Sequence, residues 1–249
     1  MGMIDRKVEI AQRVQQQGRV SVAELAQAYG VSTMTIRRDL ARLEQEGLVT
    51  VEYGGAILKQ RAWLEMDMHQ KQGEFREEKR RIAEAALAWI RDGDSVFVDA
   101  GTSACEAARL LKGKKNLNIM TNSLLAANAL AGSDNKLLMC PGEYRGLSMA
   151  FLGPVANAFL QSFRFDVLLL GVEGITDGIY VPDETDGLTK RCLMQQADNV
   201  ICLADSSKFG KRFHYRVAGL EEINHLITDN RLEEPEARAI REKTDLILV

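Results

Sequence analysis

Apolar residues in the first part of the chain recur every three or four positions, which is the spacing of short amphipathic helices. The first stripe consists of Ile4, Val8, Ala11 and Val14, and the second of Val22, Leu25, Ala26 and Tyr29. Gly18 is expected to end the first helix. Ser21 and Glu24 predict a capping box before the second, in which the Ser oxygen accepts from the third helical amide and the Glu reaches back. Two short helices are therefore expected to open the chain.

A third helix is predicted after residues 30–32, with Ser32 as its N-cap. Its inward positions are Ile36, Leu40 and Leu43. Its outward face holds Met34, Arg38, Ala41, Arg42 and Gln45, with Thr35 and Arg37 beside it. Residues 47–58 then place β-branched residues on either side of a Gly-Gly turn, which predicts a β-hairpin wing. Two helices joined by a glycine-containing turn present the second of them to the major groove of DNA.

From about residue 77 the pattern changes to short, continuous apolar runs that alternate with amphipathic segments. The runs are 95–99, 117–121, 136–140, 166–171, 199–205, 225–229 and 245–249. The amphipathic segments lie near 78–91, 103–112, 123–131, 154–163, 187–197 and 234–243. Continuous runs are typical of strands that are buried on both faces of a parallel sheet. The chain is thus predicted to hold a DNA-binding domain at 1–58, a polar linker at 59–76 and a mostly parallel α/β domain at 77–249.

Arg37 and Arg38 allow two interpretations. Arginine bonds guanine edges or holds phosphates, and nearby hydroxyl groups contact either. Alternatively, both arginines are solvated surface charge that pairs with Asp39 or Glu44. The helical pattern alone leaves both interpretations open.

The formal net charge of −3 hides an asymmetry between the two parts of the chain. Residues 1–62 contain nine Lys and Arg against seven Asp and Glu, a balance of +2, whereas the remainder contains 23 against 28, a balance of −5. A mildly basic head permits binding to nucleic acid. No apolar run approaches the roughly 20 residues that span a bilayer, and charged residues stand where a signal peptide would be apolar. We therefore expect a cytoplasmic protein with no membrane partner.

Cysteine and histidine give no sign of a metal site. Cys105, Cys140, Cys192 and Cys202 have no CxxC spacing, and the three histidines are scattered. We expect the cysteines to be small buried side chains, with no metal, disulfide or cofactor.

Polar clusters follow several of the predicted strands, at 99–103, 121–123, 171–174 and 205–208. Ligands of an open parallel sheet bind beyond the carboxyl ends of its strands. The first two clusters run directly into helices, whose free amides and dipole favour an anion. The alternative is local capping, because Ser103 with Glu106 also fits a capping box and Ser123 also fits an ordinary N-cap. Two clusters at one sheet edge favour a binding site.

Specific motifs occur along nearly the whole chain. Residues 31–40 (VSTMTIRRDL), 43–49 (LEQEGLV) and 53–56 (YGGA) closely resemble the signature of the DeoR family of bacterial transcriptional regulators. Residues 92–103 (DGDSVFVDAGTS), 121–123 (TNS) and 203–210 (LADSSKFG) resemble that family's effector domain. The resemblance implies a winged helix-turn-helix head, a sensor domain similar in fold to ribose-5-phosphate isomerase, and a phosphorylated sugar as effector.

The resemblance also implies the residues of both sites. The expected DNA-binding residues are Ser32, Thr33, Met34, Thr35, Arg37, Arg38, Arg42 and Tyr53. The phosphate and nearby hydroxyls would be held by Asp99, Gly101, Thr102, Ser103, Thr121, Asn122 and Ser123. The sugar would be ringed by Glu184, Lys190, Asp205 and Lys208, with Gly142 also at the site. Lys190 and Lys208 could each instead be solvated charges.

Two departures from the family pattern change these expectations. The wing carries Thr50, Val51 and Glu52 where relatives usually carry arginines, so the third helix should supply most of the affinity and the dependence on salt should be modest. Pro141-Gly142-Glu143 replaces the usual Gly-Gly pair, and Glu143 is expected to intrude on the pocket and alter which ligand fits.

The resulting prediction is a repressor of a carbohydrate-utilisation operon. It would act as a homo-oligomer, a dimer or tetramer, on double-stranded operator DNA, with a phosphorylated sugar modulating its affinity. The alternative is a sugar-phosphate isomerase with an accessory head, which needs a carboxylate base. The loop at 171–174 offers only Glu173, whereas isomerase relatives offer a cluster of acids. A third alternative is a protein-interaction adaptor that uses the winged helix as its contact surface.

Overall fold

The computed structural model describes residues 6–7, 9–10, 13–14, 19–45, 49–58 and 68–249. Contacts divide the chain into two compact units, Met1–Glu65 and Met66–Val249, and each is described by itself.

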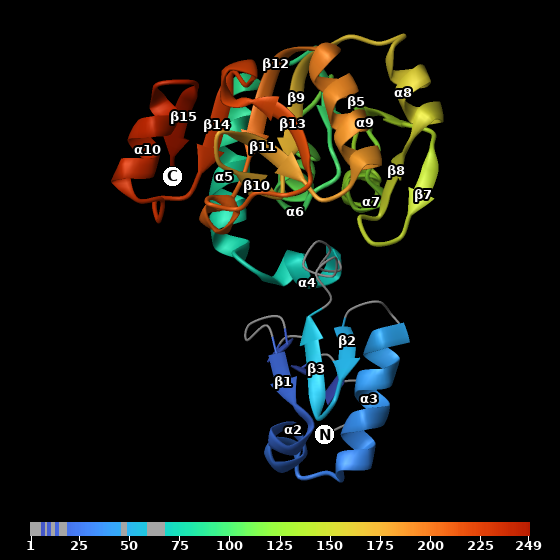
Figure 1. Ribbon diagram of the computed structural model, residues 1–249. Helices are drawn as coiled ribbons and strands as arrows, with labels where there is room; N and C mark the ends of the chain where they lie inside the picture. The colour runs from blue at the N-terminus through green and yellow to red at the C-terminus, as the bar shows by residue number, and fades with distance from the viewer. Residues whose placement is uncertain (1–5, 8, 11–12, 15–18, 46–48, 59–67) are drawn as a thin grey trace. The chain divides into compact units, whose positions relative to one another are not determined.

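The first unit contains helices α2 (Val22–Tyr29) and α3 (Thr33–Gln45), and a small antiparallel sheet. The sheet has the order β1-β3-β2, with β1 at Arg19–Ser21, β2 at Val49–Glu52 and β3 at Gly55–Leu58 (Figure 1). The predicted wing hairpin is confirmed as β2 and β3, whereas β1 was not predicted. Ile4, Val8, Ala11 and Gly18, together with residues 47–48, lie outside the described residues, but Val14 of the first stripe is buried.

The predicted apolar face of α3 is confirmed, because Ile36, Leu40 and Leu43 are at most 1% exposed. Ser32 caps this helix by accepting from the Thr35 amide at 3.2 Å. The predicted capping box of α2 is wrong in its geometry. Ser21 accepts from the second helical amide, that of Ala23, at 3.2 Å, rather than from the third. Ser21 is the last residue of β1 and has an extended backbone, and α2 begins directly after it at Val22.

The second unit is built on a seven-stranded sheet in which every pair of neighbours is parallel. Its order is β15-β14-β12-β9-β4-β5-β6 (Figure 1). The strands are β4 (Ser95–Val98), β5 (Asn118–Thr121), β6 (Lys136–Met139), β9 (Phe165–Gly171), β12 (Ala197–Leu203), β14 (His225–Thr228) and β15 (Asp245–Leu248). They match the seven predicted apolar runs, which confirms the mostly parallel α/β fold.

Both faces of the sheet are covered, as the continuous apolar runs require. In β9, Val167 and Leu169 pack into one core, while Leu168 and Leu170 pack into the other. The first face is covered by α5 (Arg76–Ala86), α6 (Thr102–Leu111) and α7 (Leu124–Leu130). The second is covered by α8 (Pro154–Leu160), α9 (Glu184–Gln195) and α10 (Glu234–Arg241). Helix α4 (Met68–Gly73) and the 3-10 turns η2 (Leu87–Trp89), η3 (Ser206–Lys208) and η4 (Leu220–Glu222) complete the helical elements of this unit's described chain.

Two small antiparallel elements were not predicted. One is the hairpin of β7 (Glu143–Arg145) and β8 (Ala150–Leu152). The other is a sheet of β10 (Gly174–Ile175), β11 (Gly178–Val181) and β13 (Tyr215–Gly219), which packs on the core of the second face. Their strands have two to five residues, which is too short for an alternating pattern to stand out.

The four cysteines are all buried and free, as expected for small core side chains. Burial raises the pKa of each thiol, to about 12 for Cys140 and Cys202. Within the described ranges, no helix has the length and apolar character needed to cross a membrane.

Leu169→Ala should lower the free energy of unfolding by about 2–5 kcal/mol, because it opens a cavity in the centre of the parallel sheet. The exposed Val155 provides a matched control, and Val155→Ala should change stability by about 0.5 kcal/mol or less. Urea unfolding of the full chain, followed by circular dichroism, measures both. Equal midpoints for the two variants would contradict this description of the core.

Candidate functional site

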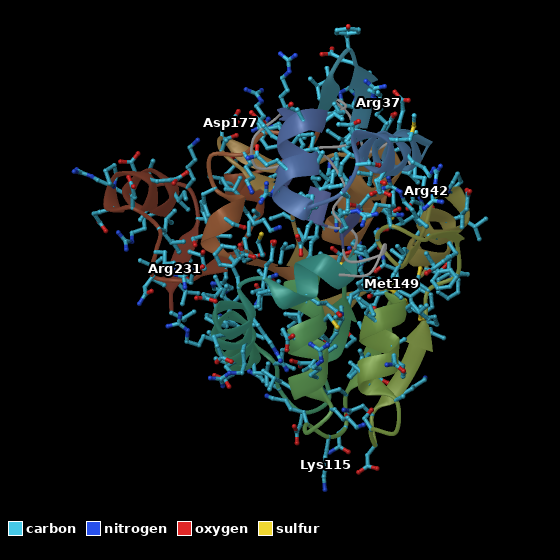
Figure 2. All side chains as sticks on the ribbon, turned by 90° about the horizontal axis from the view of Figure 1, so that it is seen from below. Arg37, Arg42, Lys115, Met149, Asp177 and Arg231 are labelled. Carbon is cyan, nitrogen blue, oxygen red and sulfur yellow. The ribbon has the colours of Figure 1, made fainter. Side chains whose placement is uncertain are left out.

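An exposed surface on α3 carries the side chains predicted to meet DNA. Thr33, Arg37 and Arg38 are exposed, and Met34 is 62% exposed. Figure 2 labels Arg37 and also Arg42, which is half-buried on the same helix. Thr35 and the N-cap Ser32 are joined by a hydrogen bond of 2.9 Å between their hydroxyl oxygens. Tyr53 is fully exposed at the turn of the wing.

The alternative interpretation, in which Arg37 and Arg38 pair with Asp39 or Glu44, is not found in the described chain. Asp39 is buried and pairs with Arg6, with 2.8 Å between Nε and Oδ2. Glu44 instead accepts from the amide of Val51 in the wing at 2.8 Å. In the described part of the chain, Arg37 and Arg38 pair with no acid. Their charges therefore face outward.

The second site lies where the direction of the strand order reverses. The chain enters the sheet at β4, adds β5 and β6 on one side, and then adds β9, β12, β14 and β15 on the other. The reversal falls between β4 and β9, and ligands of open α/β sheets bind at such a point. Asp99 directly follows β4, and Gly171 ends β9. The two are joined, since the Gly171 amide donates to Asp99 Oδ2 at 3.2 Å.

Asp99 and Lys190 form a buried ion pair at this point. Lys190 Nζ lies 2.5 Å from Asp99 Oδ2 and 3.5 Å from Asp186 Oδ1, one helical turn earlier in α9. Burial alone would lower the pKa of Lys190, but the carboxylates of Asp186 and Asp99 raise it. Burial raises the pKa of Asp186 to about 6, and the charges of Asp99 and Glu173 add to this against the opposing effect of Lys190. Lys190 is therefore not a solvated charge.

The N-terminus of α6 adjoins this ion pair. Its N-cap is Gly101, which offers no side-chain cap, and the first turn holds the buried residues Thr102 and Ser103. The capping box suggested for Ser103 is wrong, because Ser103 lies inside the helix and Glu106 pairs with Arg109. The helix therefore presents uncapped amides, which favour an anion.

The end of β5 supplies one unsatisfied amide side chain. Thr121 Oγ1 donates to the Val98 carbonyl at 2.6 Å and accepts from the Ser123 amide at 3.0 Å. Ser123 Oγ accepts from the Ala126 amide, so Ser123 is an ordinary N-cap of α7. Asn122 differs from both, because its side-chain nitrogen and oxygen are buried and make no hydrogen bond with any described residue.

Asp99 Oδ1 is likewise buried without a hydrogen-bond partner among the described residues. Register pairs Val98, just before Asp99, with Thr121, just before Asn122. Leaving a buried polar group unpaired costs on the order of 1–3 kcal/mol. Asp99 and Asn122 are thus two groups at this edge that a polar ligand would satisfy, and Asp205 Oδ2, after β12, is a third buried atom without a hydrogen-bond partner among the described residues.

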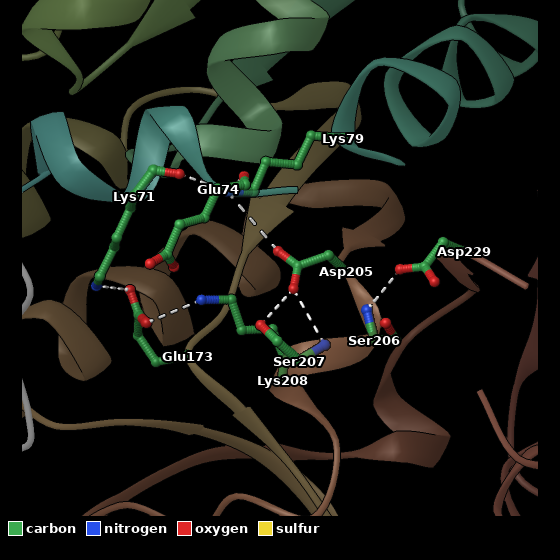
Figure 3. A network of polar contacts seen from close by, with 9 residues as sticks. All are labelled: Lys71, Glu74, Lys79, Glu173, Asp205, Ser206, Ser207, Lys208 and Asp229. Atoms are coloured by element: carbon green, nitrogen blue, oxygen red, sulfur yellow. Dashed lines mark hydrogen bonds and ion pairs between the residues drawn. The ribbon is translucent and has the colours of Figure 1, made fainter. Parts of the chain in front are cut away.

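Charged residues after β9 and β12 complete the edge (Figure 3). Asp205 is buried, caps η3, and accepts from the Ser207 amide at 3.1 Å. Lys208 Nζ lies 3.3 Å from Glu173 Oε2. Burial lowers the pKa of Lys79, and its Nζ lies 3.9 Å from Asp205 Oδ2, which is an ion-pair distance but too long for a hydrogen bond.

The structure does not bring every predicted residue into this cluster. Glu184 is exposed in the first turn of α9, where Asp186 rather than Glu184 reaches Lys190. Gly142 lies before β7, and a Cβ there would stand 2.7 Å from the Leu152 carbonyl, so it serves the hairpin. Glu143 is exposed in β7, so the expected intrusion into the pocket is not seen.

Asp186, Lys71 and Lys79 were missed by the sequence analysis. The four-residue spacing of Asp186 and Lys190 on one helix was an available signal. No signal in the sequence indicated Lys71 and Lys79, because only the folding of the chain brings them to this edge of the sheet.

A helix-turn-helix unit and a parallel α/β unit in one chain define the class of two-part transcription regulators. The DeoR-like helix-turn-helix domain model matches residues 6–62, and the DeoR C terminal sensor domain model matches residues 74–230. The chain belongs to the DeoR family.

Named relatives are similar over most of their length. The glycerol-3-phosphate regulon repressor of Escherichia coli is 33% identical over 232 residues, which are 92% of this chain and 92% of that protein. The lactose phosphotransferase system repressor of Staphylococcus epidermidis is 34% identical over 235 residues, 92% of this chain and 93% of that protein. Among solved structures, ribose 5-phosphate isomerase A of Methanocaldococcus jannaschii is 15% identical, with a TM-score of 0.40 over 54% of each chain.

The raised pKa of Asp186 predicts a pH dependence of stability. Between about pH 4 and about pH 6 the folded protein keeps a proton on Asp186 that the unfolded chain has lost, so the free energy of unfolding should fall as the pH rises. The size should be on the order of 1–3 kcal/mol. Asp186→Asn should flatten this decline in urea unfolding, whereas Asp134→Asn, at an exposed position, should not. An unchanged slope in Asp186→Asn would contradict the assignment.

Proposed function

We propose that this protein is a repressor of a carbohydrate-utilisation operon, which binds double-stranded operator DNA through α3 and releases it when a phosphorylated sugar binds the sheet edge. One observation carries the proposal. Asp99 follows β4 at the strand-order reversal and precedes the N-terminus of α6, Asn122 follows the neighbouring strand β5, and both carry buried polar atoms without a hydrogen-bond partner in the described chain, which also holds a helix-turn-helix unit.

The surface of α3 supports the DNA-binding part of the proposal. Arg37 and Arg38 are exposed without an acidic partner in the described chain, and Ser32, Thr33 and Thr35 place hydroxyl groups at the same helix end. Arginines of this kind bond guanine edges or phosphates. A head this small makes few contacts, so we propose that a homo-oligomer presents paired heads to a symmetric operator.

The polar sheet edge supports the sugar-phosphate part. Amides at the start of α6, with Thr102 and Ser103, suit a phosphate group. Asp99 and Asn122 suit hydroxyl groups, since one accepts hydrogen bonds and the other both donates and accepts. A relative named as a glycerol-3-phosphate regulon repressor supports a small phosphorylated effector here. Binding must favour one conformation to lower operator affinity, and the coupling is reciprocal.

The isomerase alternative is weakened by the state of Glu173, its candidate base. Burial would raise the pKa of Glu173, but the ammonium groups of Lys208 and Lys71 lower it to about 2. A base works best when its pKa lies near the operating pH, so this carboxylate is a poor proton acceptor.

Arg38→Ala should weaken operator binding by about 5- to 150-fold, because one bidentate base contact contributes about 1–3 kcal/mol. Fluorescence anisotropy at a fixed salt concentration measures this against a matched control, Arg238→Ala, which removes an exposed arginine from α10. Equal affinities for Arg38→Ala and Arg238→Ala would remove α3 as the reading helix.

Asn122→Ala should separate ligand binding from stability. Its amide makes no hydrogen bond with the described chain, so its loss should not lower the melting temperature, but it should reduce the thermal shift given by pentose and hexose monophosphates. Thr102→Ala should act in the same direction, and both variants should bind operator normally. A full thermal shift in Asn122→Ala would contradict the proposed site, and joint loss of DNA binding and ligand response would indicate misfolding.

A further inference from the structure

Helix α4 is attached to the sheet edge by two lysines. Lys71, on α4 itself, donates from Nζ to Glu173 Oε1 at 2.6 Å. Lys79, on α5, donates from Nζ to the carbonyls of Lys71 at 2.6 Å and Glu74 at 2.7 Å, at the end of α4 (Figure 3). Its ammonium also faces Asp205. The position of α4 is thereby tied to residues that follow β9 and β12.

Glu173 lies between two cations. Its Oε1 accepts from Lys71, and its Oε2 lies 3.3 Å from Lys208 Nζ. All three side chains are largely removed from water, with exposed fractions of 28% for Glu173, 14% for Lys71 and 15% for Lys208. Two ammonium groups that converge on one carboxylate form an anion site, and here a side chain of the same molecule fills it.

The turn that joins α4 to α5 is also held in place. Phe75 has φ of 51°, a left-handed conformation that a bulky residue rarely adopts. The guanidinium of Arg231 lies 5.5 Å from the centre of its ring and pairs with Glu78. At the other end of α4, Met68 is buried and its amide donates to the Leu147 carbonyl at 3.4 Å. These contacts hold the two ends of α4. The Lys71–Glu173 pair adds a charged contact between α4 itself and the loop after β9.

In the sequence, α4 lies between the stretches that match the two domain models. The DNA-binding domain model ends at residue 62, and the sensor domain model begins at residue 74. Helix α4 spans Met68–Gly73 and so lies between the two matched stretches, as the first element of the second unit. In the sequence, α4 is therefore the element of the second unit that directly follows the stretch joining the two units.

We propose that Lys71 and Lys208 form an anion site occupied by Glu173, and that an anionic group of the effector displaces this carboxylate and so releases α4. The inference rests on the proposed function, because the phosphate proposed for the start of α6 would lie at the same sheet edge: a Cβ on Gly101 would stand 3.4 Å from Cα of Gly171, two residues before Glu173. A phosphate carries more negative charge and more acceptor oxygens than a carboxylate, so it competes well for two ammonium groups. The two states differ in which anion the lysines hold, which gives the ligand the differential affinity that a conformational shift requires.

Hydrogen exchange on the full chain tests the attachment without any ligand. Lys71→Gln and Glu173→Gln should each speed amide exchange within residues 68–73 by about 5-fold or more, a size typical of a single coupling contact. The double variant should be no faster than either single one, since both remove the same pair. Arg80→Gln, which breaks exposed pairs with Glu77 and Glu84 on α5, is the matched control and should leave α4 unchanged. Unchanged exchange in α4 for both Gln variants would overturn the attachment.

Binding of inorganic phosphate, measured by calorimetry, tests the displacement. Glu173→Gln should tighten phosphate binding by about 5-fold because the internal competitor is gone, and Lys71→Gln should weaken it by a similar factor because a cation is lost. A purely structural role would not move affinity in opposite directions for the two halves of one ion pair. Affinities that change in the same direction, or not at all, would overturn the displacement.

The same titrations separate this inference from the proposed function. If the wild-type chain binds phosphate and Thr102→Ala weakens that binding, the proposed site holds, and the two Gln variants alone decide the displacement. If the wild-type chain binds no phosphate or sugar phosphate, the proposed function and the displacement both fail. The exchange measurement then still decides whether Lys71 and Glu173 hold α4.

Discussion

The buried contact between Asp99 and Lys190 is the constraint on which the rest of the second unit depends. Neither side chain is more than 3% exposed, and two charges are tolerated at that depth only when they are paired and hydrogen-bonded. Asp99 directly follows β4, Lys190 belongs to α9, and the amide that also bonds Asp99 belongs to Gly171 at the end of β9. The pair thereby fixes β4, its neighbour β9 and helix α9, which covers the second face of the sheet, relative to one another at one point. The polar edge is assembled around that point.

The parallel core was predictable because its strands are buried on both faces. Residues such as Leu168 and Leu169 must both be apolar when they enter different cores, and this produces a continuous run that cannot be confused with a surface strand. The inward face of α3 was predictable for a related reason, since Ile36, Leu40 and Leu43 repeat with the helical period. Strands β1, β7 and β10 have only two or three residues. Their pairing depends on partners elsewhere in the chain, and no local pattern encodes it.

The candidate site was predictable in part. Residues 99–103 and 121–123 stood out because polar residues between a strand and a helix must lie at the carboxyl edge of the sheet. The division of roles within them was not visible, since only the hydrogen bonds distinguish Ser123, which caps α7, from Asn122, whose amide is unpaired. Lys71 lies 102 positions from Glu173 in the chain. A contact at such a separation has no trace in periodicity or composition.

The burial of every thiol has a chemical and a practical consequence. Oxidants and alkylating reagents attack the thiolate, and burial both raises the pKa of the four cysteines and shields their sulfur atoms. The four native thiols should therefore resist oxidation and alkylation as long as the chain is folded. A cysteine introduced at an exposed position, for example by Lys115→Cys, would carry the single exposed thiol of the molecule. A spectroscopic label could then be attached at one chosen place without removing any native residue of the core.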